Sequence, residues 1–169
     1  YPLSLINVEK ELKINDLKQS REKLIPFLDS PEKEIRTTTS HLLAHLYRHD
    51  WYLLADQLMG SNKKLQIIGL IEILCEIGDK NSFQFFIKFM KHLDPEIRGV
   101  ASVVALKVNA LSKDEWTFCL KDPEKTVRLS ALHWFSKHLD SKNFDILCGL
   151  LEDPAVEIRK ELSWLLGQQ

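Results

Sequence analysis

The feature that most constrains this 169-residue chain is an apolar residue that recurs about every 31 positions. We take five residues as anchors, spaced 30, 32, 30 and 31 residues apart: Ile35, Leu65, Ile97, Val127 and Ile158. Arg directly follows four of them, and Pro precedes those four by two to four residues. A fixed period between 20 and 50 residues is typical of a solenoid, in which each unit buries its apolar face against the next. The sequence therefore predicts an array of equivalent units.

Each unit reads as two helices joined by a tight turn. An Asp directly before Pro suits the start of a helix. The Asp carboxylate can accept hydrogen bonds from the unpaired N–H groups of the first turn, and Pro at the first helical position has no N–H group that would be left unpaired. Asp94, Asp122 and Asp153 have this context, and Ser30 takes the place in the first unit. We expect first helices over residues 16–27, 51–59, 82–91, 113–120 and 142–151. We expect second helices over 31–48, 61–77, 95–110, 123–138 and 154–166.

The predicted organisation is a capping helix followed by an uninterrupted array. The capping helix covers residues 1–14, and the array covers residues 15–169. Its hairpins span about 15–49, 50–79, 80–110, 111–140 and 141–169. Ser112 and Glu115 form a capping-box pattern at the start of one first helix.

The turn with Asp-Pro, followed by Val or Ile and then Arg, resembles the HEAT repeat. The short period is similar to the HEAT-like repeats of the bacterial phycobilisome-lyase-type group. The resemblance implies an all-α, armadillo-like superhelix of about five HEAT-like hairpins, in which motif Asp and Arg residues form a ladder between turns. The matching residues are Asp94, Asp122, Asp153, Arg36, Arg98, Arg128 and Arg159. The second unit, residues 60–66, has neither Pro nor Arg, so we expect the ladder to be interrupted there.

Composition argues against several classes of function. Hydrophobic residues make up 44% of the chain and charged residues 28%, with a formal net charge of −1. A general nucleic-acid binder would carry a basic excess, and no apolar stretch is long enough to cross a bilayer. Three cysteines without a C-x-x-C pair indicate buried free thiols in a reducing compartment, so we expect a cytoplasmic protein without membrane insertion.

Three histidines share one stripe of the second helix of the first unit. His41, His45 and His49 are spaced i, i+4, i+8, and two such histidines can bind a metal. No other helix offers an evident third ligand, so we favour a solvated helix edge. The His-Glu dipeptide of di-iron HEAT-like hydroxylases is also absent. We predict no catalytic residue, no cofactor and no metal site.

Placing each second helix on a wheel separates a core face from an outward face, the latter at two, six and nine residues after the anchor. The second helix of the second unit is apolar nearly all round except at Glu72 and Glu76, so it is either buried or a binding surface. The resemblance implies that second helices line the concave side. The candidate partner-binding residues are His41, Glu72, Val103, Leu106, Leu129, His133, Lys160 and Trp164.

The function that this pattern favours is a non-enzymatic protein-binding scaffold, which takes a peptide or helix on the second-helix face or at an edge. One alternative is a HEAT-like DNA glycosylase, which needs a basic channel where this chain has Val103, Leu106 and Leu129. Another is a bilin lyase or chaperone. We also expect Trp164 to be exposed at the C-terminal edge of an isolated chain. Continuation of the array would cover it, and the alternative is partner docking or self-association of copies at this edge.

Overall fold

The computed structural model describes residues 20–138 and 141–167, so the predicted capping helix over residues 1–14 lies outside the described residues. Within those ranges the chain forms helices and no strand, which confirms the all-α prediction. The chain divides after Ile77 into two units, each described by itself. The helix limits match the predicted ones to within a few residues, because Gly, Pro and Asp residues separate the helices. The exception is the first predicted helix, whose residues 16–19 lie outside the described residues and which passes into a 3-10 helix at residue 25.

Unit 1 contains the 3-10 helix η1 (Ile25–Asp29) and the helices α3 (Lys33–Leu46), α4 (Trp51–Leu58) and α5 (Lys64–Ile77). Helix α3 packs against both η1 and α5, and α4 packs against α5. The core is aliphatic and includes Leu28, Leu43, Leu54, Leu70 and Leu74, none of which is exposed. Tyr47 and Trp51 are buried at the corner between α3 and α4, whereas Tyr52 is exposed.

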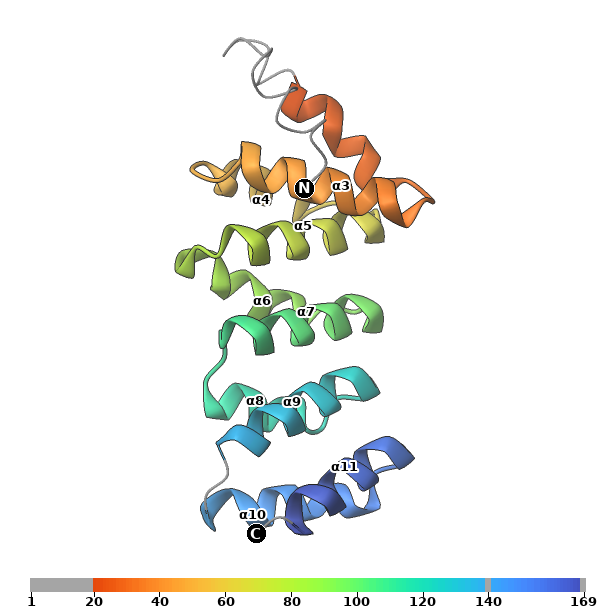
Figure 1. Cartoon of the computed structure of the whole chain (residues 1–169), viewed down its shortest axis with the longest axis vertical. Helices are drawn as coiled ribbons and strands as arrows, with labels where there is room; N and C mark the ends of the chain where they lie inside the picture. Colours follow the sequence, from red (N-terminus) through yellow and green to blue (C-terminus); the bar gives the residue numbers. More distant parts are fainter. Residues whose placement is uncertain (1–19, 139–140, 168–169) are drawn as a thin grey trace. The chain divides into compact units, whose positions relative to one another are not determined.

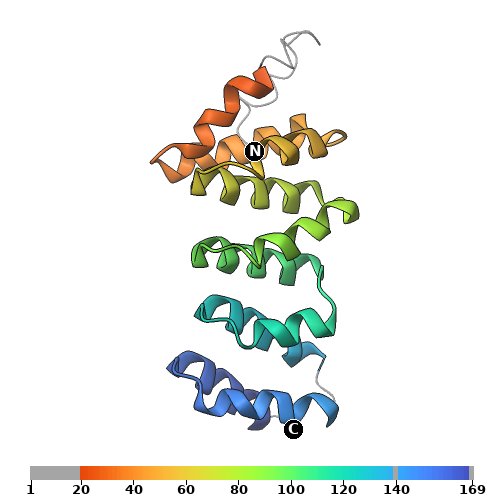
Figure 2. The same ribbon diagram turned by 180° about the vertical axis from the view of Figure 1, so that it is seen from behind.

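Unit 2 is a series of three helical hairpins. Its elements are η2 (Lys80–Ser82), α6 (Phe83–Phe89), α7 (Pro95–Val108), α8 (Lys113–Cys119), α9 (Lys125–Lys137), α10 (Ser141–Cys148), η3 (Gly149–Glu152) and α11 (Val156–Gly167). Helix α6 pairs with α7 and α8 with α9, while α7 packs on α9 and α9 on α11 (Figures 1 and 2). The second helices therefore form a continuous row within this unit.

The same hydrogen bond recurs in each hairpin, in the turn that precedes its second helix. The side chain of a residue three positions before the helix accepts from the backbone N–H two residues later, at distances of 2.7 to 3.2 Å. We call this residue the turn acceptor. The turn acceptors are Ser30, Ser61, His92, Asp122 and Asp153, spaced 31, 31, 30 and 31 residues apart. They define the structural register of the repeat.

This register corrects the position of one predicted anchor, and the structure corrects the burial of another. Counted five residues on from its turn acceptor, the second anchor is Gln66 and not Leu65. Leu65 lies in the first turn of α5 and is only partly buried. Ile35 is also partly exposed, because it lines an open recess of about 250 Å³ with Glu34, Thr38 and Thr39. The other three anchors, Ile97, Val127 and Ile158, are buried.

The register also corrects the predicted role of the Asp-Pro pairs. Asp94 caps α7 directly, accepting from the N–H of Glu96 at 2.9 Å, and Pro95 is the first residue of the helix. Helices α9 and α11 instead begin two residues after their Pro. Asp122 is therefore not the N-cap, a role that Glu124 takes by accepting from Thr126. The predicted capping box of Ser112 and Glu115 is confirmed.

The repeated Arg residues hold the turns together. Each donates from Nη1 to the two carbonyls six and five residues before it, at 2.5 to 3.2 Å. In unit 2, Nε and Nη2 of Arg98 also donate to Asp122, at 3.0 to 3.3 Å, so the predicted ladder forms there. In unit 1 the turn acceptor after Arg36 is the uncharged Ser61, and no described carboxylate pairs with Arg36. This confirms the predicted interruption.

The second rung of the ladder joins Arg128 to Asp153. Burial of Asp153 by itself would raise the pKa of the carboxyl group, because burial disfavours the charged form. Hydrogen bonds from Arg128 and from the N–H of Ala155 reverse this effect, and the pKa of Asp153 is lowered from its ordinary value. The carboxylate therefore stays ionised although it is buried.

Candidate partner-binding surface

Each second helix presents one equivalent residue away from its core. This residue stands eleven positions after the turn acceptor, and we call it the outward residue. The five outward residues are His41, Glu72, Val103, His133 and Trp164. All five were candidates from the sequence, and each side chain is exposed or partly exposed. The helix-wheel prediction of an outward face is confirmed at His41, Val103, His133 and Trp164. In the second unit it was wrong, because the position six residues after Leu65 is Ile71, which is buried.

In unit 2 this outward face is mainly apolar. Val103 on α7 is 37% exposed and Trp164 on α11 is 61% exposed. Leu106 on α7 and Leu129 on α9 are partly exposed. We call Val103, Leu106, Leu129 and Trp164 the apolar face. Because α9 contacts both α7 and α11, three adjacent helices contribute to it (Figure 1). Two of its side chains leave a large part of their surface in water.

Charged and polar side chains border the apolar face. His133 Nε2 lies 3.5 Å from Glu161 Oε1 on the neighbouring helix, and Lys160 is exposed beside Trp164. Nearer the start of the same helices, Lys125 Nζ donates to Glu157 Oε1 at 2.9 Å, and this hydrogen bond lowers the pKa of Glu157. The sequence reasoning missed the pairing with Glu161. The register would have revealed it, since His133 and Glu161 occupy nearby positions of successive second helices.

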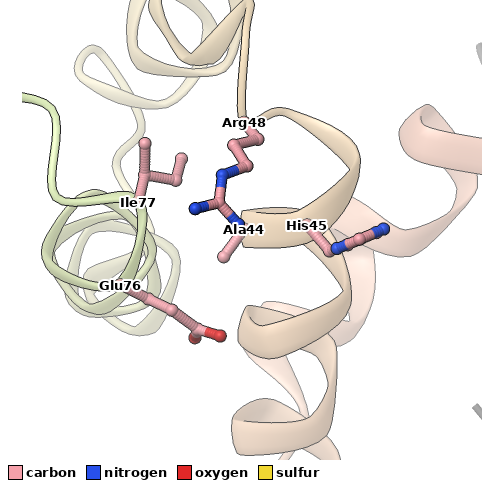
Figure 3. A pocket seen from close by; sticks show the side chains of 5 residues that line it. All are labelled: Ala44, His45, Arg48, Glu76 and Ile77. Carbon is pink, nitrogen blue, oxygen red and sulfur yellow. The ribbon is translucent and has the colours of Figure 1, made fainter.

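The corresponding face of unit 1 is polar. His41 Nδ1 lies 2.6 Å from Glu76 Oε2, and Ser40 donates to Glu72 at 3.3 Å. Between α3 and α5 lies a small recess of about 60 Å³, lined by Ala44, His45, Arg48, Glu76 and Ile77 (Figure 3). Its volume is that of about two water molecules. The candidates His41 and Glu72 are therefore ion-paired or hydrogen-bonded surface residues, unlike the apolar candidates of unit 2.

Some residues predicted on the outward face are buried instead. Ala44 is buried in α3, which packs against α5. Gly99 lies so close to α9 that an added Cβ would meet the Thr126 side chain at 3.4 Å. These positions face the neighbouring second helix, so the outward face is narrower than the wheel predicts. Of the two alternatives for α5, burial is correct for its centre, where Ile67, Leu70, Ile71, Ile73 and Leu74 are all buried.

The histidine stripe and the thiols show no arrangement suited to metal binding or nucleophilic chemistry. His41, His45 and His49 are exposed, as predicted for a solvated edge. Within residues 20–138 and 141–167 no group of three or more His, Cys, Asp or Glu side chains could hold a metal ion. Burial, aided by Asp122 and Glu115, raises the pKa of Cys119 to about 12. Cys75 and Cys148 carry reduced thiols and are only partly buried, so the prediction of buried thiols holds for Cys119 alone.

Comparison with known proteins gives no independent assignment. No protein-family model matches the chain, and no curated protein matches it significantly. Among the described helices, none has both the length and the apolar character needed to cross a bilayer. The functional argument therefore depends on the surface itself.

Proposed function

We propose that this chain is a HEAT-like solenoid that acts as a non-enzymatic protein-binding scaffold. The observation that carries the proposal is the apolar face of unit 2, where Val103 and Trp164 stand at equivalent positions and are both well exposed. Large exposed aromatic side chains are costly to leave in water and are enriched among the residues that dominate protein interfaces.

The geometry of the row suits an amphipathic helix that crosses α7, α9 and α11. Packed helices lie about 8–10 Å apart, so successive outward residues lie at similar intervals. A helix rises about 1.5 Å per residue, so its residues seven positions apart are separated by about 10.5 Å and share one face. A partner helix with apolar residues at every seventh position would contact Val103, the Leu129 and His133 pair, and Trp164 in turn.

The surface is poorly suited to the alternative functions. A nucleic-acid channel requires basic residues that can pair with phosphates, whereas apolar side chains occupy the centre of this face. The bordering carboxylates of Glu157 and Glu161 would repel a phosphate backbone. In the described part of the chain, no group of three or more His, Cys, Asp or Glu side chains could hold a catalytic metal ion.

The test is affinity capture with matched variants of the full chain. Val103→Glu and Trp164→Glu each place a charge in the apolar face. Phe118→Glu is the control, because Phe118 is 66% exposed on the first helix α8 and lies off this face. We expect one or more proteins to be captured by the original chain and by the Phe118 variant, and lost with both face variants.

Binding of the captured protein is then measured by titration with the purified components. A face variant should weaken the affinity by at least tenfold, which corresponds to about 1.4 kcal/mol. If all three variants bind the partner equally well, the apolar face is not the binding surface. If the Phe118 variant alone loses binding, the first-helix side of unit 2 is the interface instead.

A further inference from the structure

Two lysines border the apolar face on one side. Lys107 on α7 and Lys137 on α9 both stand fifteen positions after their turn acceptors, so they are equivalent residues of successive second helices. Each comes four positions after an outward residue, Val103 or His133, and therefore lies one turn further along the same side of its helix. Both side chains are exposed, and no described carboxylate pairs with either of them. We call Lys107 and Lys137 the lysine row.

The opposite border of the apolar face lies near the start of the same helices and carries a different charge. On α9 the border residue is Lys125, and its Nζ lies 2.9 Å from Glu157 Oε1 on α11, which balances its positive charge. On α7 the border residue is Glu96, which is exposed in the first turn of the helix. The border near the helix starts is therefore neutral to acidic, whereas the lysine row near the helix ends is basic.

We propose that the partner of the apolar face is an amphipathic helix with one acidic flank, on which Asp or Glu residues seven positions apart pair with Lys107 and Lys137. This inference rests on the proposed function and names the chemistry of its partner. A helix that lies along the row of second helices places one flank over their starts and the other over their ends. Residues seven positions apart on a flank advance by about 10.5 Å, close to the roughly 8–10 Å between packed helices. Two carboxylates can therefore meet the two lysines in turn.

The difference in charge between the two borders favours a helix over a larger polyanion. A phosphate backbone or an anionic membrane would cover both borders and would bring negative charge against Glu96 and Glu157. A helix presents different residues to its two sides, so it can be acidic over the lysine row and uncharged over the other border. It can also lie in either direction, so a single acidic flank is enough. The lysines lie in the last turns of α7 and α9 and stabilise these helices too, but that role affects folding and not the choice of partner.

The experiment uses three labelled helical peptides and the full chain. The peptides share Leu residues at alternating intervals of three and four positions on one face, and Gln along one flank. The other flank carries Glu, Gln or Lys at every seventh position. Fluorescence anisotropy measures the affinity of each peptide in about 50 mM and about 500 mM NaCl, because exposed ion pairs are screened by salt. A DNA duplex and vesicles of phosphatidylserine and phosphatidylcholine are titrated in parallel.

We expect the Glu peptide to bind about fivefold more tightly than the Gln peptide in low salt, and the Lys peptide to bind most weakly. High salt should reduce these differences. The double variant Lys107→Glu with Lys137→Glu should reverse the order of the peptides, which a mere loss of stability would not do. The matched control is Lys91→Glu with Lys121→Glu. These exposed lysines each precede a turn acceptor, at the other end of the same two hairpins, so their reversal should leave the order unchanged.

Several results would overturn the inference. One is an order of affinities that reversal of the lysine row leaves unchanged or that the control variant also reverses. Another is DNA or vesicle binding that is tighter than that of the Glu peptide and is lost on reversal of the lysine row. The Val103→Glu variant separates this inference from the proposed function. If Val103→Glu weakens all three peptides while reversal of the lysine row changes nothing, the apolar face still binds helices and the acidic flank alone is wrong. If no peptide binds, or if Val103→Glu affects none of them, the helix-binding role of the face fails as well.

Discussion

Arg128 and Asp153 form a two-armed ion pair that is almost closed to solvent. Nε lies 2.7 Å from Oδ2 and Nη2 lies 2.9 Å from Oδ1, and the two side chains are 9% and 3% exposed. The third arm of Arg128, Nη1, donates to the carbonyls of Asp122 and Pro123. One guanidinium group thus joins its own turn to the turn of the following hairpin. Loss of the carboxylate would leave a buried cation without its counter-charge.

We predict that Asp153→Asn destabilises the chain by about 3 kcal/mol, within the range for breaking one side of a buried ion pair. The amide oxygen of Asn can still accept from the N–H of Ala155, so the loss reports mainly on Arg128. Urea unfolding followed by circular dichroism measures the change. Glu152→Gln is the control, because Glu152 is exposed and adjacent, and it should change stability by less than about 0.5 kcal/mol. Equal effects of the two substitutions would contradict the assignment.

The same ion pair predicts a pH dependence. The pKa of Asp153 is lowered in the folded chain, so the folded state holds its proton less tightly than the unfolded state. Its contribution is therefore fully present above the unfolded pKa of about 3.9, and is lost as the pH falls through the lower folded value. In urea titrations between pH 7 and pH 2, the gap between the original chain and Asp153→Asn should narrow below about pH 4. A gap that stays constant down to pH 2 would show that the ionisation of Asp153 is not linked to folding.

The core anchors of unit 2 predict a contrast between two aliphatic residues only four positions apart. Ile97→Ala removes a side chain that is 1% exposed and should cost about 2–5 kcal/mol. Leu93 is 95% exposed in the preceding turn, so Leu93→Ala should change stability by less than about 0.5 kcal/mol. Thermal unfolding of both variants measures the difference. Similar midpoints for the two would place Ile97 outside the core.

The sequence alone predicts the helices well, because the period, the breakers and the apolar spacing are local properties of the chain. The exact register is harder to predict, since the anchors were matched by residue type. Leu65 has the right chemistry but lies one position too early, and Asp94 resembles Asp122 while occupying a different place in its turn. The turn acceptors share a hydrogen bond and not a residue type. His92 accepts the turn hydrogen bond that Asp122 accepts in its own hairpin. In the sequence, only the constant spacing of the turn acceptors would have indicated this role of His92.

The candidate surface could also be predicted only in part. The outward residues Val103 and Trp164 could be predicted, because a side chain opposite the core of a helix faces solvent unless something covers it. Gly99 could not be placed in the same way, since its burial depends on how closely α9 approaches α7.

Trp164 predicts a direct spectroscopic readout of the apolar face. The chain has four tryptophans, and Trp51, Trp116 and Trp134 are all buried. Iodide, which quenches only solvent-accessible indoles, should therefore act mainly on Trp164. The Trp164→Phe variant should lose most of the iodide-sensitive emission, whereas Trp134→Phe should keep it, since Trp134 packs between Trp116 and His138.

A protein that occupies the apolar face should protect Trp164 from iodide and shift its emission to shorter wavelength, because the indole leaves water. Iodide quenching that persists unchanged in Trp164→Phe would mean that another indole is open to solvent and that the face is built differently. Full quenching of Trp164 in the presence of saturating partner would place that partner elsewhere on the chain.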